Sequence, residues 1–292
     1  MRLSINLTTR GRPERMLGSV TRSMPMLKLK STRLIISVDD DDQATVDALK
    51  FLPQDKRIIP DIRPREDSLG AKYNRVLDYP ADVYMSAADY GTFCTPGFDR
   101  IILDAAALFP DGIGCVFGHM ANASFSQIYG VTHGLVQKMG WLYPPYWPYW
   151  FVDHWVHDVA RLIDRIAFAD VQVDYQNKPP TQEMRDIRFW STLYDMHRPT
   201  RRNSAHAIIR SRDFQEPAWR KRLLLKAHPL AEFWSQGIND YLRSNATAFE
   251  VANVASGLPG GDRYDRLKAK GEAMMRELAP KMMSELVWGA AA

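Results

Sequence analysis

Apolar and polar positions follow two different spacings along the first 175 or so residues of the chain. Short apolar runs of about five residues alternate with segments in which apolar residues recur at helical spacing. The runs predict five strands, at residues 3–7, 34–38, 57–62, 82–86 and 114–118. Strands separated by helical segments of roughly 10–15 residues are typical of βαβ units. The pattern therefore predicts an α/β fold, with a mostly parallel sheet flanked by helices.

Residues that favour helix starts mark the segments between the strands. Proline suits the first turn of a helix and serine suits its N-cap, so helices are predicted at 13–24, 68–77 and 96–108. Apolar spacing adds helices at 44–51, 132–140 and 153–166, followed by a last strand at 171–174. Beyond residue 180 the pattern is helical to the end, with a break at 257–261. We therefore expect an α/β domain at 1–178 and a helical C-terminal region at 179–292.

Polar residues gather at three of the predicted strand ends. The first strand is followed by Thr8-Thr9-Arg10-Gly11-Arg12, the second by four aspartates at 39–42, and the fourth by Ala87-Ala88-Asp89-Tyr90. Parallel sheets of this kind bind ligands in the crevice beyond the carboxyl ends of their strands. The three segments therefore predict a binding site at one edge of the sheet.

Composition limits the kind of protein. The 292 residues include only two cysteines, Cys94 and Cys115, which argues against a disulfide framework or a zinc cluster and favours a cytoplasmic location. No stretch approaches the roughly 20 apolar residues of a membrane span. The net charge is +4, but residues 181–230 hold eleven Lys or Arg against five Asp or Glu. This basic segment indicates either an anionic partner or a solvated helical face.

Five segments in this order resemble one known group of enzymes. They read TTRGRP, SVDDDD, SLGAKYNRVLDYP, DVYMSAADY and WFVDHWVHDVARLIDR. The ordered set resembles GT-A fold glycosyltransferases, in particular the bacterial and phage family-2-like type, and it covers residues 3–175. The resemblance implies an enzyme that moves a sugar from a nucleoside-diphosphate sugar, with a UDP-sugar favoured, to an acceptor hydroxyl, with inversion.

The resemblance also implies roles in donor binding. Asp39 would accept hydrogen bonds from the base or ribose, Lys72 would neutralise a phosphate, and Asn74 would hold a loop or the sugar. The nucleotide would be lined by the residues after the first strand, Thr8, Thr9 and Arg10.

A divalent metal is part of the same expectation. Asp89 matches the last acid of the DxD motif that binds Mn²⁺ or Mg²⁺ at the donor diphosphate. Ala87 stands where the motif has its first acid, so the expected site is weaker and a metal-independent variant stays open. Asp174, just after the last predicted strand, is a further candidate ligand. His154 and His157 are a less favoured pair of candidate metal ligands.

Asp153 would be the catalytic base that takes the proton of the acceptor hydroxyl. It could equally cap the helix that begins there. Asp158 is the alternative base. The aromatic stretch 141–151 would form a wall for the acceptor, or would simply pack. His119 and His133 would line the acceptor side.

The acceptor and the class of protein keep alternatives. The acceptor is a polysaccharide or a hydroxymethylated base in DNA, because the basic segment 181–230 and the aromatic stretch both suit DNA. A nucleotidyltransferase is less favoured because Gly11 is the one glycine after the first strand. A non-catalytic nucleotide or nucleic-acid binding module is the third possibility. The sequence does not determine the oligomeric state.

Overall fold

A seven-stranded sheet forms the centre of the computed structural model, which describes residues 1–118, 127–148, 151–175, 186–226, 244 and 262–289. Its strands lie in the order β3-β2-β1-β4-β7-β6-β8. Their bounds are β1 Leu3–Thr8, β2 Arg33–Asp39, β3 Ile58–Arg63, β4 Val83–Ala88, β6 Cys115–Gly118, β7 Gln127–Thr132 and β8 Ile166–Phe168. Strand β7 pairs antiparallel with β4 and β6, and the other pairings are parallel. The predicted α/β fold with a mostly parallel sheet is confirmed.

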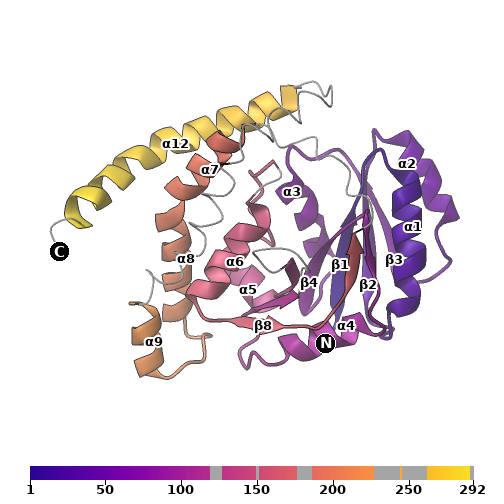
Figure 1. Cartoon of the computed structure of the whole chain (residues 1–292), viewed down its shortest axis with the longest axis horizontal. Coiled ribbons are helices and arrows are strands. Elements are labelled where there is room, and N and C mark those ends of the chain that lie inside the picture. Colours follow the sequence, from indigo (N-terminus) through magenta and orange to yellow (C-terminus); the bar gives the residue numbers. More distant parts are fainter. Residues whose placement is uncertain (119–126, 149–150, 176–185, 227–243, 245–261, 290–292) are drawn as a thin grey trace.

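Helices and short 3-10 turns cover both faces of the sheet (Figure 1). Those of the first 162 residues are α1 Pro13–Ser23, η1 Met24–Met26, α2 Gln43–Ala48, η2 Leu49–Phe51, α3 Leu69–Asn74, η3 Arg75–Asp78, α4 Phe98–Ala106, α5 His133–Met139 and α6 Val152–Leu162. Neighbouring residues of a strand point to opposite faces. Accordingly, Ile35 packs in one apolar core with α5 and α6, whereas Leu34 and Ile36 pack in the other with α1 and α4.

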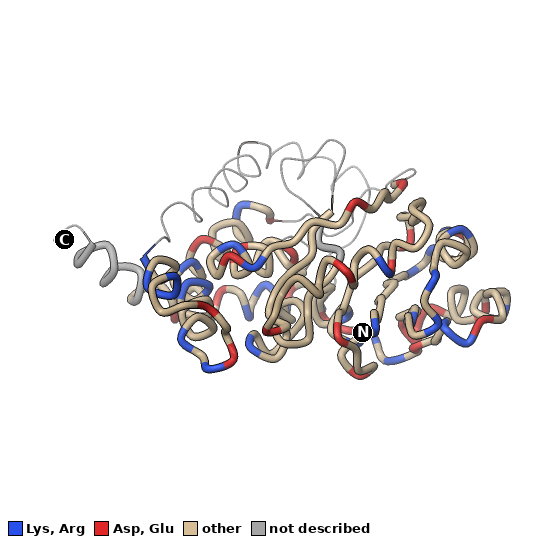
Figure 2. Tube along the Cα trace, turned by 90° about the horizontal axis from the view of Figure 1, so that it is seen from below, with Lys and Arg blue, Asp and Glu red and all other residues tan. Residues whose placement is uncertain are grey.

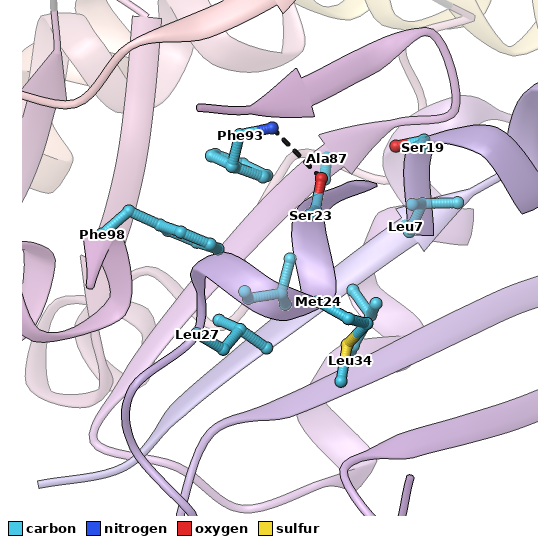
Figure 3. A pocket seen from close by; sticks show the side chains of 10 residues that line it. Leu7, Ser19, Ser23, Met24, Leu27, Leu34, Ala87, Phe93 and Phe98 are labelled. Atoms are coloured by element: carbon cyan, nitrogen blue, oxygen red, sulfur yellow. Dashed lines mark hydrogen bonds between the residues drawn. The ribbon is translucent and has the colours of Figure 1, made fainter. Parts of the chain in front are cut away.

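The core beneath α1 and η1 holds a small apolar cavity, which Figure 3 shows from close by. Leu7, Met24, Phe93 and Phe98 are among its lining side chains. The backbone N–H of Phe93 donates to Ser23 Oγ at 3.1 Å across its rim. The cavity measures about 10 Å³, which is at the lower limit for one water molecule. It is therefore a packing defect and no site for a nucleotide.

Four helices of the C-terminal region are described: α7 Ile187–Met196, α8 Arg198–Arg210, α9 Ala218–Leu224 and α12 Asp262–Gly289. Trp190 of α7, Ile208 of α8 and Leu267 of α12 are buried in the same apolar core as α6. Helix α12 runs across one side of the molecule above α7 (Figure 1). None of the described helices is both long enough and apolar enough to cross a bilayer.

Two local predictions were wrong or incomplete. Helix α6 ends at Leu162 rather than near 166, because Asp164 adopts a left-handed φ of 53° and the chain then enters β8. Strands β7 and β8 were not predicted. A second, two-stranded sheet pairs β5 Gly91–Phe93 antiparallel with β9 Val173–Tyr175, the last predicted strand.

Candidate functional site

The site lies where the order of the strands reverses. Strand β1 has β2 on one side and β4 on the other, although β4 follows β3 in the chain. Thr8 at the end of β1 is paired with Ala88 at the end of β4. Such a reversal opens a crevice beyond the carboxyl ends of the two strands. The polar segments after β1, β2 and β4 all reach this crevice.

Asp89 is buried in the crevice with a relative exposure of 1%. Its Oδ2 accepts a hydrogen bond from Thr9 Oγ1 at 2.9 Å and lies 2.9 Å from Arg12 Nε. Its Oδ1 is buried and has no hydrogen-bond donor among the described residues. Burial raises the pKa of the Asp89 carboxyl, and the charge of Arg12 and the hydroxyl of Thr9 oppose that shift. The Thr9 hydroxyl is therefore engaged in a hydrogen bond to Asp89.

Asp39 is buried beside three cations. Its carboxylate lies 2.9 Å from Lys72 Nζ, 3.2 Å from Arg10 Nη1 and 3.4 Å from Arg75 Nη2. Lys72 Nζ also donates to the backbone oxygen of Thr9 at 2.8 Å. Burial lowers the pKa of Lys72, whereas the charge of Asp39 acts to raise it. Lys72 thus ties the end of β1 to the end of β2 and carries its charge into the crevice.

Two other aspartates shape the loop after β1. Arg10 makes a bidentate ion pair with Asp41, with N–O distances of 2.5 and 3.0 Å. Asp42 accepts from the backbone N–H of Gly11 at 2.6 Å and caps helix α2 through the N–H of Thr45. These contacts explain the aspartate run as loop and helix-capping groups around Arg10.

Asn74 holds the loop that follows α5. Its Oδ1 accepts from the backbone N–H groups of Leu142 and Tyr143, both at 2.9 Å, and its Nδ2 donates to the oxygen of Tyr143 at 2.8 Å. These three bonds occupy the side chain amide. The sugar contact that was also expected of Asn74 has no support in this geometry.

The aromatic stretch packs instead of forming an open wall. Tyr143, Trp147 and Phe151 are buried in the core that includes α6. Trp147 meets Trp190 of α7 edge-on, with ring centroids 5.7 Å apart. The structure thus corrects the expectation of an acceptor wall for these three rings. Residues 149 and 150 lie outside the described residues.

Tyr73 of α3 packs beside the end of β1 and against the loop that leads to α6. Its ring lies 5.3 Å from that of Tyr143, and the Thr8 side chain lies beside its hydroxyl. Burial raises the pKa of Tyr73, and the charges of Asp153 and Asp89 both reach it and raise it further.

Asp153 is the second residue of α6, and its side chain is 40% exposed. Its Oδ1 contacts His154 Nδ1 at 2.8 Å and accepts from the His154 backbone N–H at 2.9 Å. Partial burial works to raise the pKa of Asp153, but the contacts with His154 outweigh it and the pKa is lowered. The group is thus an exposed carboxylate, which is the form that a general base needs.

The residue at the start of this helix has an unusual backbone. Phe151, the N-cap of α6, has a φ of 73°, which bulky residues rarely adopt. Its buried ring stacks on Tyr194 at 4.7 Å. The ring contact holds the backbone in this conformation, and the backbone in turn sets the direction in which α6 presents Asp153.

The prediction of Asp158 as an alternative base was wrong. Asp158 is buried, accepts from the Tyr194 hydroxyl at 2.5 Å and pairs with Arg201 Nε at 2.9 Å. A carboxylate compensated in this way is part of the core that joins α6 to α7 and α8. His157 is likewise buried against Phe117, and burial lowers its pKa to about 3.

The remaining candidates lie in different places. Asp174 is exposed on β9, opposite Thr92 of β5, while its neighbour Tyr175 contacts the ring of Tyr90 at 5.8 Å. Among the described residues, no group of three or more His, Cys, Asp and Glu side chains could hold a metal ion. His133 does not lie at the crevice. Its backbone N–H donates to the backbone oxygen of Asp82 just before β4, at the opposite end of that strand from Asp89. His119 lies outside the described residues.

Three residues that the structure brings to the crevice were not among the predicted site residues. Arg12 faces Asp89, Arg75 faces Asp39, and Tyr73 packs against Tyr143. All three stand inside segments that carried the resemblance: Arg12 is two residues from the candidate Arg10, and Tyr73 and Arg75 each adjoin the candidate Asn74. The spacing of three residues between Lys72 and Arg75 on a predicted helix could have identified Arg75. Nothing in the sequence pairs Arg12 with Asp89.

The chain resembles known proteins in its structure. Neither a protein-family model nor a curated protein matches the chain. The mannosyltransferase PcManGT from Pyrobaculum calidifontis, in complex with GDP-Man and Mn²⁺, matches 99% of this chain and 86% of its own, with a TM-score of 0.51 and 12% identity. S. aureus TarS 1–349 in complex with UDP-GlcNAc matches 80% of this chain and 73% of its own, with a TM-score of 0.52 and 13% identity. The chain has a GT-A fold. At such low identity the likeness concerns the fold alone.

Proposed function

We propose that the chain is a glycosyltransferase that moves a sugar from a nucleoside-diphosphate sugar to an acceptor hydroxyl, with inversion. The observation that supports this proposal is a buried carboxylate, Asp89, held beside Arg12 at the strand reversal, together with the partly exposed carboxylate of Asp153 at the start of α6. Asp89 is buried with a cationic partner, and Asp153 is exposed with a lowered pKa. One carboxylate suits the charged end of a donor, and the other suits proton removal from an acceptor.

The donor site is assigned to the cations of the crevice. Arg12 and Lys72 lie at the ends of β1 and α3, and Arg10 extends the positive charge toward β2. Thr8 and Thr9 line the end of β1, and Asp39 holds Lys72 and Arg10 in place, within reach of the ribose or base. A diphosphate that leaves with negative charge is stabilised by such preorganised cations. The two similar structures hold UDP-GlcNAc and GDP-Man, so a UDP-sugar is the first donor to test.

A divalent metal fits the site through one protein ligand. Asp89 Oδ1 is buried and has no donor among the residues that the structure describes, so it could accept a cation, although Ala87 leaves the usual first acid missing. Mg²⁺ often binds through one or two carboxylates together with substrate phosphates. Asp89 would therefore hold Mn²⁺ or Mg²⁺ with the diphosphate, with Asp174 as a second candidate. Bound there, the ion would add Lewis-acid stabilisation of the leaving group.

The transfer step is assigned to Asp153. Its carboxylate accepts the proton of the acceptor hydroxyl while that oxygen forms a bond to the anomeric carbon. The bond from the anomeric carbon to the diphosphate oxygen breaks, and its electron pair leaves with the nucleoside diphosphate. Attack opposite the leaving group inverts the configuration. The acceptor is a glycan or a hydroxymethylated DNA base, and a salt titration of DNA binding separates the two.

The test compares Asp153→Asn with Asp170→Asn, which changes another exposed aspartate. Purified protein is incubated with UDP-, GDP- and TDP-sugars and Mn²⁺, and donor turnover and thermal shift are measured. Asp153→Asn should lose roughly 10²–10⁴-fold in turnover and keep its thermal shift with nucleotide, as expected for a lost general base. Asp170→Asn should behave as wild type. No response of the wild type to any donor would refute the proposal.

A further inference from the structure

Four large apolar side chains are exposed on elements that meet at one groove. Leu108 is 71% exposed, Phe168 61%, Trp219 62% and Leu223 57%. The groove is lined by Leu108, by Ile166 and Ala167 of β8 and by Arg220 of α9, so it joins the elements that carry these side chains. The end of α4, strand β8 and α9 follow the lower border of the molecule in Figure 1. We call this surface, with Leu108, Phe168 and residues 210–226, the α9 face.

Helix α9 turns a mixed apolar and basic stripe outward. Trp219 and Leu223 are four residues apart, as are Arg222 and Lys226, so these pairs fall on one side of the helix and of the turn that continues it. Leu224 is buried on another side. The helix is thus anchored by one side chain and presents two apolar and two cationic side chains together.

The charge of the α9 face is not balanced by its own acids. Residues 210–226 contain six Lys or Arg but only Asp213 and Glu216 as acids. Asp213 pairs with Lys138, and Glu216 pairs with Arg165 and Arg220. No ion pair to another described residue is made by the four exposed cations Arg210, Arg212, Arg222 and Lys226. Figure 2 shows Lys and Arg gathered at the end of the molecule that α8 and α9 form.

We propose that the α9 face docks on an anionic lipid surface. Tryptophan and leucine beside lysine and arginine are the composition of helices that lie in the membrane interface. Exposed cations are attracted to anionic headgroups, and the apolar side chains enter the boundary below them. A nucleic acid would use the cations but would leave Leu108 and Leu223 in water, whereas a bilayer buries both. The proposal stands apart from the donor site, which lies at the strand reversal.

Vesicle flotation of the full chain tests the proposal. The probes are phosphatidylcholine vesicles with and without phosphatidylglycerol, at low and high salt. We expect binding to the anionic vesicles, weakening as salt rises, and little binding to phosphatidylcholine alone. Each Lys or Arg near an anionic surface contributes about fivefold in partitioning, so Arg222→Ala with Lys226→Ala should lose about 25-fold. Trp219→Ala with Leu223→Ala should also release the protein.

The matched control is Phe51→Ala with Lys50→Ala, an exposed aromatic and its neighbouring cation on η2. This pair should leave vesicle binding unchanged. Melting temperature and nucleotide response show that each variant is folded, and the nucleotide response reports on the proposed function separately. The proposal is overturned if anionic vesicles do not bind, if the α9 variants bind as wild type, or if duplex DNA binds through these residues while vesicles do not.

Discussion

Gly70 is the residue whose replacement tests the packing of the site most sharply. A Cβ atom at this position would lie 2.1 Å from the backbone oxygen of Pro144. Ordinary contacts of a Cβ atom begin at 3.4 Å, so helix α3 or the loop must move by about 1 Å. The same helix start bonds to this loop through Ser68 Oγ, which donates to the oxygen of Pro145 at 2.5 Å, and through the N–H of Leu69. Gly70→Ala therefore separates surfaces that are held together by hydrogen bonds.

The size of the effect follows from these contacts. Loss of two hydrogen bonds and of close packing costs about 2–4 kcal/mol. Alanine returns about 1 kcal/mol through its helix propensity and the smaller entropy of the unfolded chain. Gly70→Ala should thus lower the free energy of unfolding by about 1–3 kcal/mol. For a protein of this size that lowers Tm by roughly 2–12 °C. Donor affinity should fall as well, because α3 carries Lys72.

Gly18→Ala in α1 is the matched control. Its Cβ would meet only the flexible end of Arg22, at 3.6 Å. The change should raise the free energy of unfolding by about 0.5–1 kcal/mol, as for glycine to alanine in an unhindered helix. Urea unfolding followed by circular dichroism measures both variants. If Gly70→Ala were as stable as Gly18→Ala, the close approach of α3 to residue 144 would be refuted.

Two further predictions concern charged groups. Arg201→Met should lower the free energy of unfolding by about 3–5 kcal/mol, because it removes the charge that compensates the buried Asp158 carboxylate. The control Arg210→Met, at an exposed position, should change that free energy by less than about 0.5 kcal/mol. Urea unfolding measures both variants. Because the pKa of Asp153 is lowered, transfer should persist down to the ordinary pKa of an aspartate and fall only below it. A pH profile of kcat/KM measures this, and an acid limb near neutrality would contradict Asp153 as the base.

The spacing of apolar residues predicted most of the fold. Leu34–Val38 is a short apolar run, which is typical of a strand buried on both faces of a sheet. Leu3–Leu7 alternates apolar and polar residues, yet Ser4 and Asn6 are buried as well. Strand β5 is three residues long and depends on pairing with residues 173–175, far along the chain. Local pattern carries no information about such a partner, so this small sheet could not be predicted.

The candidate site was predictable in its segments but not in its pairings. Asp153 and Asp158 are two acids on one helix, and only the positions of Tyr194 and Arg201 distinguish the exposed carboxylate from the buried one. In the same way, the sequence places Arg12 near the end of β1 without showing that it faces Asp89. Contacts between distant segments decide these roles, and they follow from the topology of the sheet.

The shared core of α6, α7, α8 and α12 has a consequence for the growing chain. That core includes Ile35 near the beginning of the sequence and Leu267 near its end. During synthesis, the face of the sheet that carries Ile35 stays uncovered until α5 and α6 have left the ribosome, and the core on that face is completed only when α12 follows. The other face, which α1 and α4 cover, can close after residue 106. The nascent protein therefore exposes this apolar face of the sheet for longer than the other face, and that face is where chaperones would act.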